Sequence, residues 1–275
     1  MGRAALDILD TAVLDMGFFH FDESVHPTAK FALGAFVYSE EPLDDLVGDA
    51  LHQSGLTPGV DEFKSSVRMD RNPEFAQARE RLKSILHLRC GIGVTVAPPS
   101  PRTLLGHEGL YGLNKILSTI TFRSKSHDVF FDQGIFSSVA AGERAVKTIS
   151  LAQPCSFHFE QDSKRIMGLQ VADLVAHMCA TMLLCELGLI KKTVKAGVNS
   201  GYDPDLDVEL GFELWATLRY RFFAAPPPPV DTWKSQLDYQ VDVESVGLHV
   251  AQTCDTNVRD SATVRFGKMY LGCIH

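Results

Sequence analysis

One aromatic stretch near the start of the chain constrains the fold more than any other feature. Residues 16–24 read MGFFHFDES, and this apolar run ends abruptly in two acids. Its phenylalanines have the size and β-propensity of residues in a buried strand. Because an unpaired charge beside a buried strand is costly, Asp22 and Glu23 mark the place where that strand leaves the sheet. An acid there is either a turn-capping residue or part of a ligand site, since open α/β sheets bind ligands at the carboxyl ends of their strands.

The alternation of strand and helix patterns over residues 16–188 predicts an α/β fold. Strands are expected at 16–24, 30–39, 90–97, 128–131 and 155–160, and helices at 43–54, 73–88, 103–122, 137–147 and 164–187. The first two strands should be antiparallel, and the later helices should be crossover connections. Asp162 and Ser163 are N-cap residue types for the last helix, and residues 61–66 could form one more strand edge. We therefore expect a mixed sheet flanked by helices.

The pattern changes after the last of these helices. Residues 205–223 look helical and amphipathic, residues 226–229 are four consecutive prolines, and residues 263–274 could be a strand. A proline run of this kind favours a polyproline-like linker. We expect a domain over 1–188 and a C-terminal extension over 189–275. The extension either covers the sheet or holds a second copy of the chain or another protein partner.

Composition narrows the class of protein. The 275 residues are 45% hydrophobic and 22% charged, with a net charge of −8 and a pI of about 5.7. This composition is ordinary for a soluble globular protein, although nucleic-acid binders are more often basic. None of the six cysteines forms a CxxC pair, and we see neither a secretory signal nor an apolar run of the ~18 residues that a membrane span needs. We expect a cytoplasmic protein with free thiols and no membrane association.

One aspartate interrupts an otherwise apolar predicted helix. Residues 168–177 read GLQVADLVAH, so Asp173 lies among side chains that belong in a core. Gln170, Asp173 and His177 share one helix face by the i, i+3, i+4 spacing. This polar stripe could face the end of the sheet where the strand acids lie.

Four acids recur at such positions and could together hold metal ions: Asp22, Glu62, Asp132 and Asp173. Carboxylates brought close together cannot all stay ionised unless a cation bridges them. Mg2+ and Mn2+ prefer oxygen ligands and leave positions for water and substrate phosphates. Two such ions, roughly 3.5–4 Å apart, stabilise the attacking and leaving oxygens of phosphodiester hydrolysis. Any one of these acids alone is more simply explained as a structural residue such as a turn former.

Three motifs resemble those of a known family. FFHFDES at 18–24, DVFFDQG at 128–134 and DSKRIMGLQVADLVA at 162–176 together resemble the domain-of-unknown-function 3800 family, whose members share a ribonuclease H-like fold. EFKS at 62–65 is similar to that family's E-x-[KH]-x-S segment. The resemblance covers about residues 16–188. Val25 departs from the family's usual glycine after DES, so the turn there is expected to differ.

The resemblance implies both a fold and a site. The fold would be a ribonuclease H-like mixed sheet flanked by helices, followed by the C-terminal extension. The acidic set would be Asp22, Glu62, Asp132 and Asp173, supported by Ser163 and Gln170.

Other candidate residues have a structural alternative. A phosphate-binding rim could be lined by Lys64, Arg68, Arg71, Arg123, Lys125 and Lys164, or these could be solvated surface charges. His20 should lie on the same side of its strand as Asp22, where it either assists the site or is a hydrogen-bonded structural histidine. A zinc site would need His249, Cys254, Cys273 and His275, whose spacing matches no common zinc finger. The chain has no GxSxG, Walker or GxGxxG motif.

The leading hypothesis is a hydrolase: a Mg2+- or Mn2+-dependent nuclease acting on DNA or RNA. In this hypothesis Asp22 and Asp132 bridge the metals, Glu62 and Asp173 complete the two sites, and Lys64 or Arg123 steadies the scissile phosphate. Two alternatives remain open. One is a catalytically silent binding or assembly module that uses the extension to hold a partner. The other is a metal-dependent phosphatase or phosphotransferase acting on a small molecule.

Overall fold

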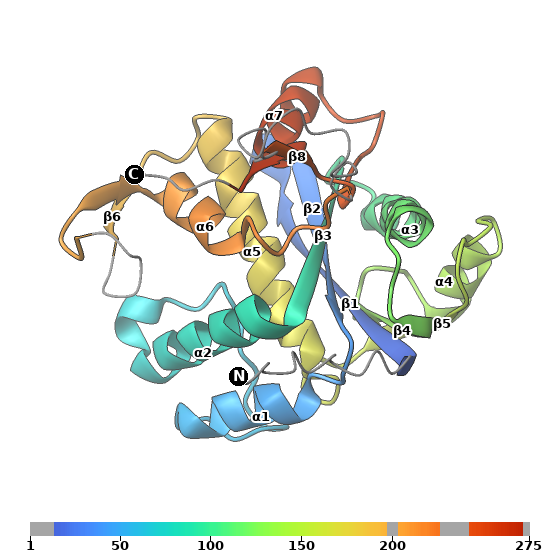
Figure 1. The fold of residues 1–275 in the computed structure, drawn as a ribbon, viewed down its shortest axis with the longest axis horizontal. Coiled ribbons are helices and arrows are strands. Elements are labelled where there is room, and N and C mark those ends of the chain that lie inside the picture. Colours follow the sequence, from blue (N-terminus) through green and yellow to red (C-terminus); the bar gives the residue numbers. More distant parts are fainter. Residues whose placement is uncertain (1–13, 197–202, 226–241, 272–275) are drawn as a thin grey trace, which may run out of the picture.

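Six strands form one mixed sheet through the middle of the molecule (Figure 1). The computed structural model describes residues 14–196, 203–225 and 242–271. The strands are β1 (Leu14–His26), β2 (Phe31–Ser39), β3 (Cys90–Ala97), β4 (Ser124–Asp132), β5 (Cys155–Gln161) and β9 (Leu248–Val250). Their order is β5-β4-β1-β2-β3-β9, and β2 alone runs against the others. The expected mixed α/β sheet is confirmed.

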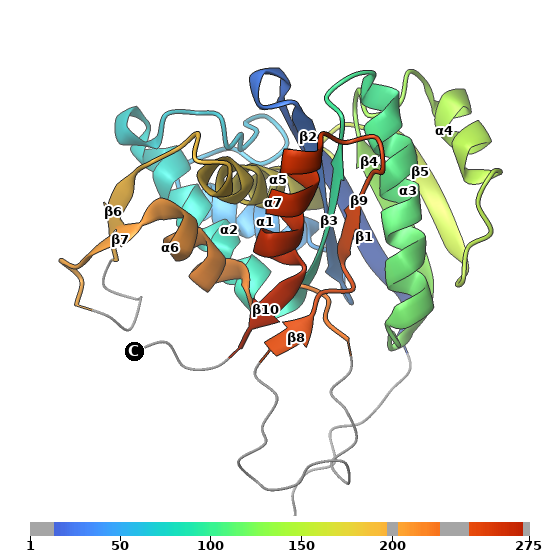
Figure 2. The same ribbon diagram turned by 90° about the horizontal axis from the view of Figure 1, so that it is seen from above.

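Helices cover both faces of this sheet, as Figure 2 shows. One face carries α3 (Arg102–Thr119) and α4 (Val139–Val146). The other carries α1 (Asp44–Gln53), α2 (Pro73–Arg89) and α5 (Gly168–Glu186). The three-layer arrangement leaves the middle of β1 with both of its faces covered, which explains why residues 17–21 are apolar except for His20.

Phenylalanines from neighbouring strands build the core on the α3 side of the sheet. The Phe21 ring lies 4.5 Å from the Phe36 ring and 5.1 Å from the Phe131 ring, centroid to centroid. Gly34 makes room for this packing, because a Cβ atom added there would come within 2.1 Å of the Phe21 ring. Such tilted aromatic contacts contribute about 0.5–1.5 kcal/mol each beyond the area they bury.

Helix α5 is the core helix of the molecule. By length and composition alone it could cross a membrane, but 72% of its most apolar window is buried inside the fold. It packs against β1 and β2 on one side and against α6 (Leu210–Leu218) and α7 (Thr256–Phe266) on the other. Its apolar character is therefore explained by contacts on most of its circumference.

Several predicted local structures differ from the observed ones. Strand β1 does not leave the sheet at Asp22 and Glu23, because backbone pairing with β2 continues to His26. Residues 61–66 form turns and irregular chain instead of a strand edge. Helix α5 begins at Gly168, later than expected, because residues 162–167 form a separate turn: the Asp162 carboxylate accepts the backbone N–H of Lys164 at 2.9 Å. Asp162 thus caps that turn and not the helix.

The chain beyond α5 returns to the same sheet. Strand β9 pairs in parallel with β3, and two small ribbons pair β6 (Thr193–Lys195) with β7 (Asp207–Glu209), and β8 (Asp242–Glu244) with β10 (Lys268–Tyr270). Two predicted elements are therefore shorter than expected: the helix expected over 205–223 is α6 alone, and residues 263–266 end α7 instead of starting a strand. The proline run lies outside the described residues, and the division at residue 188 stays a prediction.

Candidate functional site

Asp22 and Asp132 occupy matching positions on two central parallel strands. The strands pair Phe21 of β1 with Phe131 of β4, so each aspartate is the next residue along its strand. Phe21 points towards α3, where its ring meets Gly109. Because side chains alternate along a strand, both aspartates point to the opposite face, which α5 covers. The register of one strand pair thus places two carboxylates side by side under α5.

Burial and mutual repulsion perturb both of these carboxylates. Asp22 is only 4% exposed, and its pKa is raised well above its usual value, first by burial and then by the charges of Asp132 and Asp173. Burial also raises the pKa of Asp132 to about 6, although the nearby Lys64 ammonium opposes the shift. The pair therefore resists full ionisation at neutral pH unless additional positive charge arrives.

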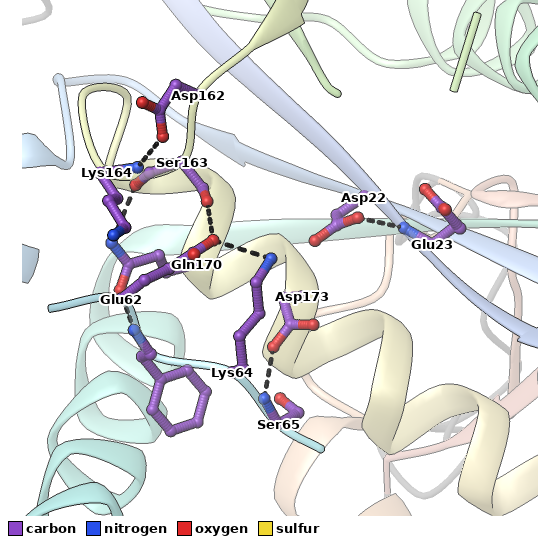
Figure 3. Close-up of polar contacts among 11 residues, drawn as sticks. Asp22, Glu23, Glu62, Lys64, Ser65, Asp162, Ser163, Lys164, Gln170 and Asp173 are labelled. Atoms are coloured by element: carbon purple, nitrogen blue, oxygen red, sulfur yellow. Dashed lines mark hydrogen bonds and ion pairs between the residues drawn. The ribbon is translucent and has the colours of Figure 1, made fainter. Parts of the chain in front are cut away.

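A loop laid along α5 completes the site (Figure 3). The backbone N–H of Phe63 donates to Gln170 Oε1, and that of Ser65 donates to Asp173 Oδ2, each at 2.7 Å. Gln170 also donates through Nε2 to the Ser163 carbonyl oxygen at 2.8 Å. Two members of the polar stripe predicted on this helix, Gln170 and Asp173, thus hold residues 62–65 in place.

The same loop brings Glu62 and Lys64 to the aspartates. The Ser163 hydroxyl donates to Glu62 Oε1, and the Lys64 ammonium lies 2.8 Å from that same oxygen. Burial alone would lower the pKa of Lys64, but the hydrogen bond to Glu62 and the charges of Asp22 and Asp132 outweigh it and raise the pKa. We call Asp22, Glu62, Asp132 and Asp173 the acid cluster; Lys64 is the cation within it.

Glu23 and Arg102 form an ion pair beside the site and were not among the site residues predicted from the sequence. Glu23 lies on the α3 face of β1, where Arg102 Nη2 donates to its Oε1. Its side chain is 6% exposed, and burial raises its pKa against the opposing charge of Arg102. Strand alternation from Asp22 could have placed Glu23 on that face. No sequence signal links it to Arg102, which is 79 residues away.

His20 is a structural residue next to the site. It is 2% exposed, and burial lowers its pKa to about 4, so it is neutral at pH 7. As expected, it lies on the same face of β1 as Asp22, directly beneath the start of α5. A Cβ atom added to Gly168 would come within 2.3 Å of His20 Nε2. The imidazole ring therefore fixes how closely α5 approaches the sheet.

Several predicted rim residues are not brought to the acid cluster. Arg123 immediately precedes β4, whereas Asp132 ends it, so the two lie at opposite ends of a nine-residue strand. Arg123 Nη1 donates to Glu40 Oε2 at 3.0 Å, and it is not placed to steady a phosphate at the cluster. Lys125 lies at that same far end, while Arg68 forms an exposed ion pair with Asp70.

The residues considered for zinc do not assemble either. His249 Nε2 lies 2.6 Å from Glu108 Oε2, Cys254 is buried, and Cys273 and His275 fall outside the described residues. Burial raises the pKa of each described cysteine. None of these five thiols is therefore poised as a thiolate nucleophile.

The acid cluster has the donor atoms that a divalent ion prefers, but its side chains are not close enough together in this structure to hold one. Its donors are carboxylate oxygens, which Mg2+ and Mn2+ prefer, and they are partly buried and mutually repulsive. Within the described residues, however, no three His, Cys, Asp or Glu side chains stand close enough together to hold a metal ion. The Lys64 ammonium supplies positive charge to the cluster in this arrangement.

Comparisons with known proteins add little to this geometry. No protein-family model matches the chain, and no curated protein matches it. Among solved structures, the ribonuclease H2 from Pyrococcus horikoshii OT3 aligns with a TM-score of 0.38 at 14% identity, covering 80% of this chain and 94% of that chain. A likeness this distant says nothing about activity.

Proposed function

We propose that this protein is a divalent-metal-dependent phosphodiesterase that cleaves nucleic acid, and that it belongs to the domain-of-unknown-function 3800 family. The observation that carries the proposal is the in-register pair of Asp22 and Asp132 on two central parallel strands, at the level where β4 ends and β1 continues beside β2. Their charges oppose each other in a buried place, and a divalent cation would relieve that repulsion. The family motifs include the same four acids.

The chain's own residues have distinct proposed roles. Asp22 and Asp132 hold the metal, and the rest of the acid cluster completes its surroundings. When bound, Mg2+ or Mn2+ would supply an activated water and stabilise charge on the phosphate oxygens. Ser163 orients Glu62 through its hydroxyl hydrogen bond, and Gln170 anchors the loop that carries both Glu62 and Lys64. Lys64 places a positive charge where the phosphate of a nucleic-acid strand can approach.

A cleavage assay with matched variants tests this proposal. We expect wild type to cleave members of a DNA and RNA panel with Mg2+ or Mn2+ and not with chelator. Asp22→Asn changes one charge and almost no volume, so it should fold but lose at least about a hundredfold in rate. Asp128→Asn is the control, because Asp128 lies on the same face of β4 but pairs with His158 away from the cluster. Metal-dependent cleavage that Asp22→Asn retains in full would contradict the mechanism.

A catalytically silent binding or assembly module is the second candidate. It is favoured by the engagement of Asp173 with the Ser65 N–H and of Glu62 with Ser163 and Lys64, which leaves these acids less free to bind a metal. In that case the extension over 189–275 would hold a second copy of the chain or another protein. Wild type that cleaves no nucleic acid and no phosphomonoester with either metal would support this candidate and exclude both hydrolase hypotheses.

A further inference from the structure

The Lys64 ammonium lies among the carboxylates that would hold a metal ion. The ammonium lies 2.8 Å from Glu62 Oε1, and Figure 3 shows the side chain extended from the loop towards the space between Glu62 and Asp22. The charges of Asp22 and Asp132 also act on it. Lys64 is thus in contact with one member of the cluster and in the electrostatic field of two others.

The surroundings of the Asp22 carboxylate hold more negative than positive charge. This buried carboxylate receives one hydrogen bond within the described residues, from the Glu23 N–H to Oδ1 at 2.7 Å. Glu23 adds a further acid, whose Oε2 is buried without a hydrogen-bond partner in the described part of the chain. Glu23 and the four acids of the acid cluster are thus set against two cations, Lys64 and Arg102. Of these two cations, Lys64 is the one on the α5 side of the sheet, with the acid cluster.

The loop is built so that the Lys64 side chain can move while its backbone stays in place. The N–H groups of Phe63 and Ser65, on either side of Lys64, are bound to α5, and the Phe63 ring is fully buried. The Lys64 side chain itself is 38% exposed. A lysine with this anchoring can swing its ammonium into solvent without unfolding the loop.

We propose that Lys64 is the resident cation of the acid cluster and that a divalent ion displaces it, so that Lys64 sets the metal concentration at which the site fills. A divalent ion and the ammonium are attracted by the same carboxylates and repel each other at short range. Metal binding therefore releases the ammonium from Glu62 and leaves it at the edge of the site, free to meet a phosphate. This inference rests on the proposed function.

Calorimetric titration with Mn2+ tests the displacement directly. We expect Lys64→Met to bind Mn2+ about tenfold more tightly than wild type, because the competing charge is gone. Lys64→Arg keeps the charge and should stay within about threefold of wild type. Lys83→Met is the matched control: Lys83 is also a partly buried lysine, 3.1 Å from Glu80 and 3.8 Å from Glu213, but it lies on α2 and should leave Mn2+ affinity unchanged.

A second measurement without metal keeps the inference independent of any activity. In chelator, Lys64→Met should melt several degrees below wild type, and below Lys83→Met, because the acids lose their counter-charge. Unchanged or weaker Mn2+ binding by Lys64→Met would overturn the inference while the proposed function stands. Failure of both wild type and Lys64→Met to bind Mn2+ would overturn the proposed function and this inference with it. If Lys64→Met does not fold, Lys64→Gln makes the same comparison.

Discussion

Replacing Asp132 by asparagine should stabilise the metal-free protein, and only above the pH at which the carboxyl group ionises. The folded protein raises the pKa of this carboxyl from 3.8 to about 6, mainly through burial. A pKa that is raised on folding favours the protonated form. The contribution of the Asp132 carboxyl to the stability of the folded protein is therefore complete below about pH 3.8 and is lost as the pH rises through about 6. At pH 7.5 the ionised Asp132 thus destabilises the fold.

The magnitude follows from linkage. A shift of about two units corresponds to about 3 kcal/mol at about 1.4 kcal/mol per unit. Solvent screening at this partly exposed carboxyl reduces the expected effect to about 1–2 kcal/mol. Asp132→Asn keeps the shape of the side chain and removes the charge, so it should gain that amount at pH 7.5 and only about a third of it at pH 4.5, where the carboxyl is still mostly protonated in the folded state but already largely ionised in the unfolded state.

Urea denaturation in chelator at both pH values, on wild type and Asp132→Asn, provides the measurement. Adding Mn2+ should then reverse the order, since the ion stabilises the folded wild type by preferential binding and the variant much less. Asp128→Asn, on the same strand face, controls for a general effect of removing a carboxylate. An equal gain for Asp132→Asn at both pH values, or none at pH 7.5, would refute the electrostatic reasoning.

Two further predictions concern the parts that hold the site together. Gly168→Ala should destabilise the protein by about 1–3 kcal/mol in urea denaturation, because the new methyl group would collide with His20 beneath α5. Gln170→Ala should cost about 2–4 kcal/mol, because it leaves the Phe63 N–H and the Ser163 carbonyl oxygen without their partner. It should also speed amide hydrogen exchange at Phe63, and unchanged protection there would contradict the anchoring role of Gln170.

Periodicity along the chain was enough to place most of the regular elements. The strand expected over 90–97 is β3 (Cys90–Ala97), and the helix expected over 73–88 is α2 (Pro73–Arg89). Both are specified by local signals, namely β-branched residues with glycines in the first case and a proline-led helical pattern in the second. Asp162 was misleading because the same side chain caps a turn as readily as a helix.

The segment over 61–66 shows the limit of local patterns. Its backbone N–H groups bond to Gln170 and Asp173 on α5, more than a hundred residues away, and not to a neighbouring strand. No pattern within six residues specifies such a partner. The segment therefore took an irregular path that only the packed helix explains.

What the sequence determined by itself was which residues carry charge beside apolar segments: Asp22 and Asp132 after aromatic runs, and Asp173 within an apolar helix. Only the tertiary structure decided which of these charges act on one another. The register between β1 and β4 sets the two strand acids side by side, and the loop on α5 brings in Lys64. The physical reason is that polarity and periodicity are local properties of the chain, whereas repulsion and neutralisation depend on distances that strand pairing and helix packing create.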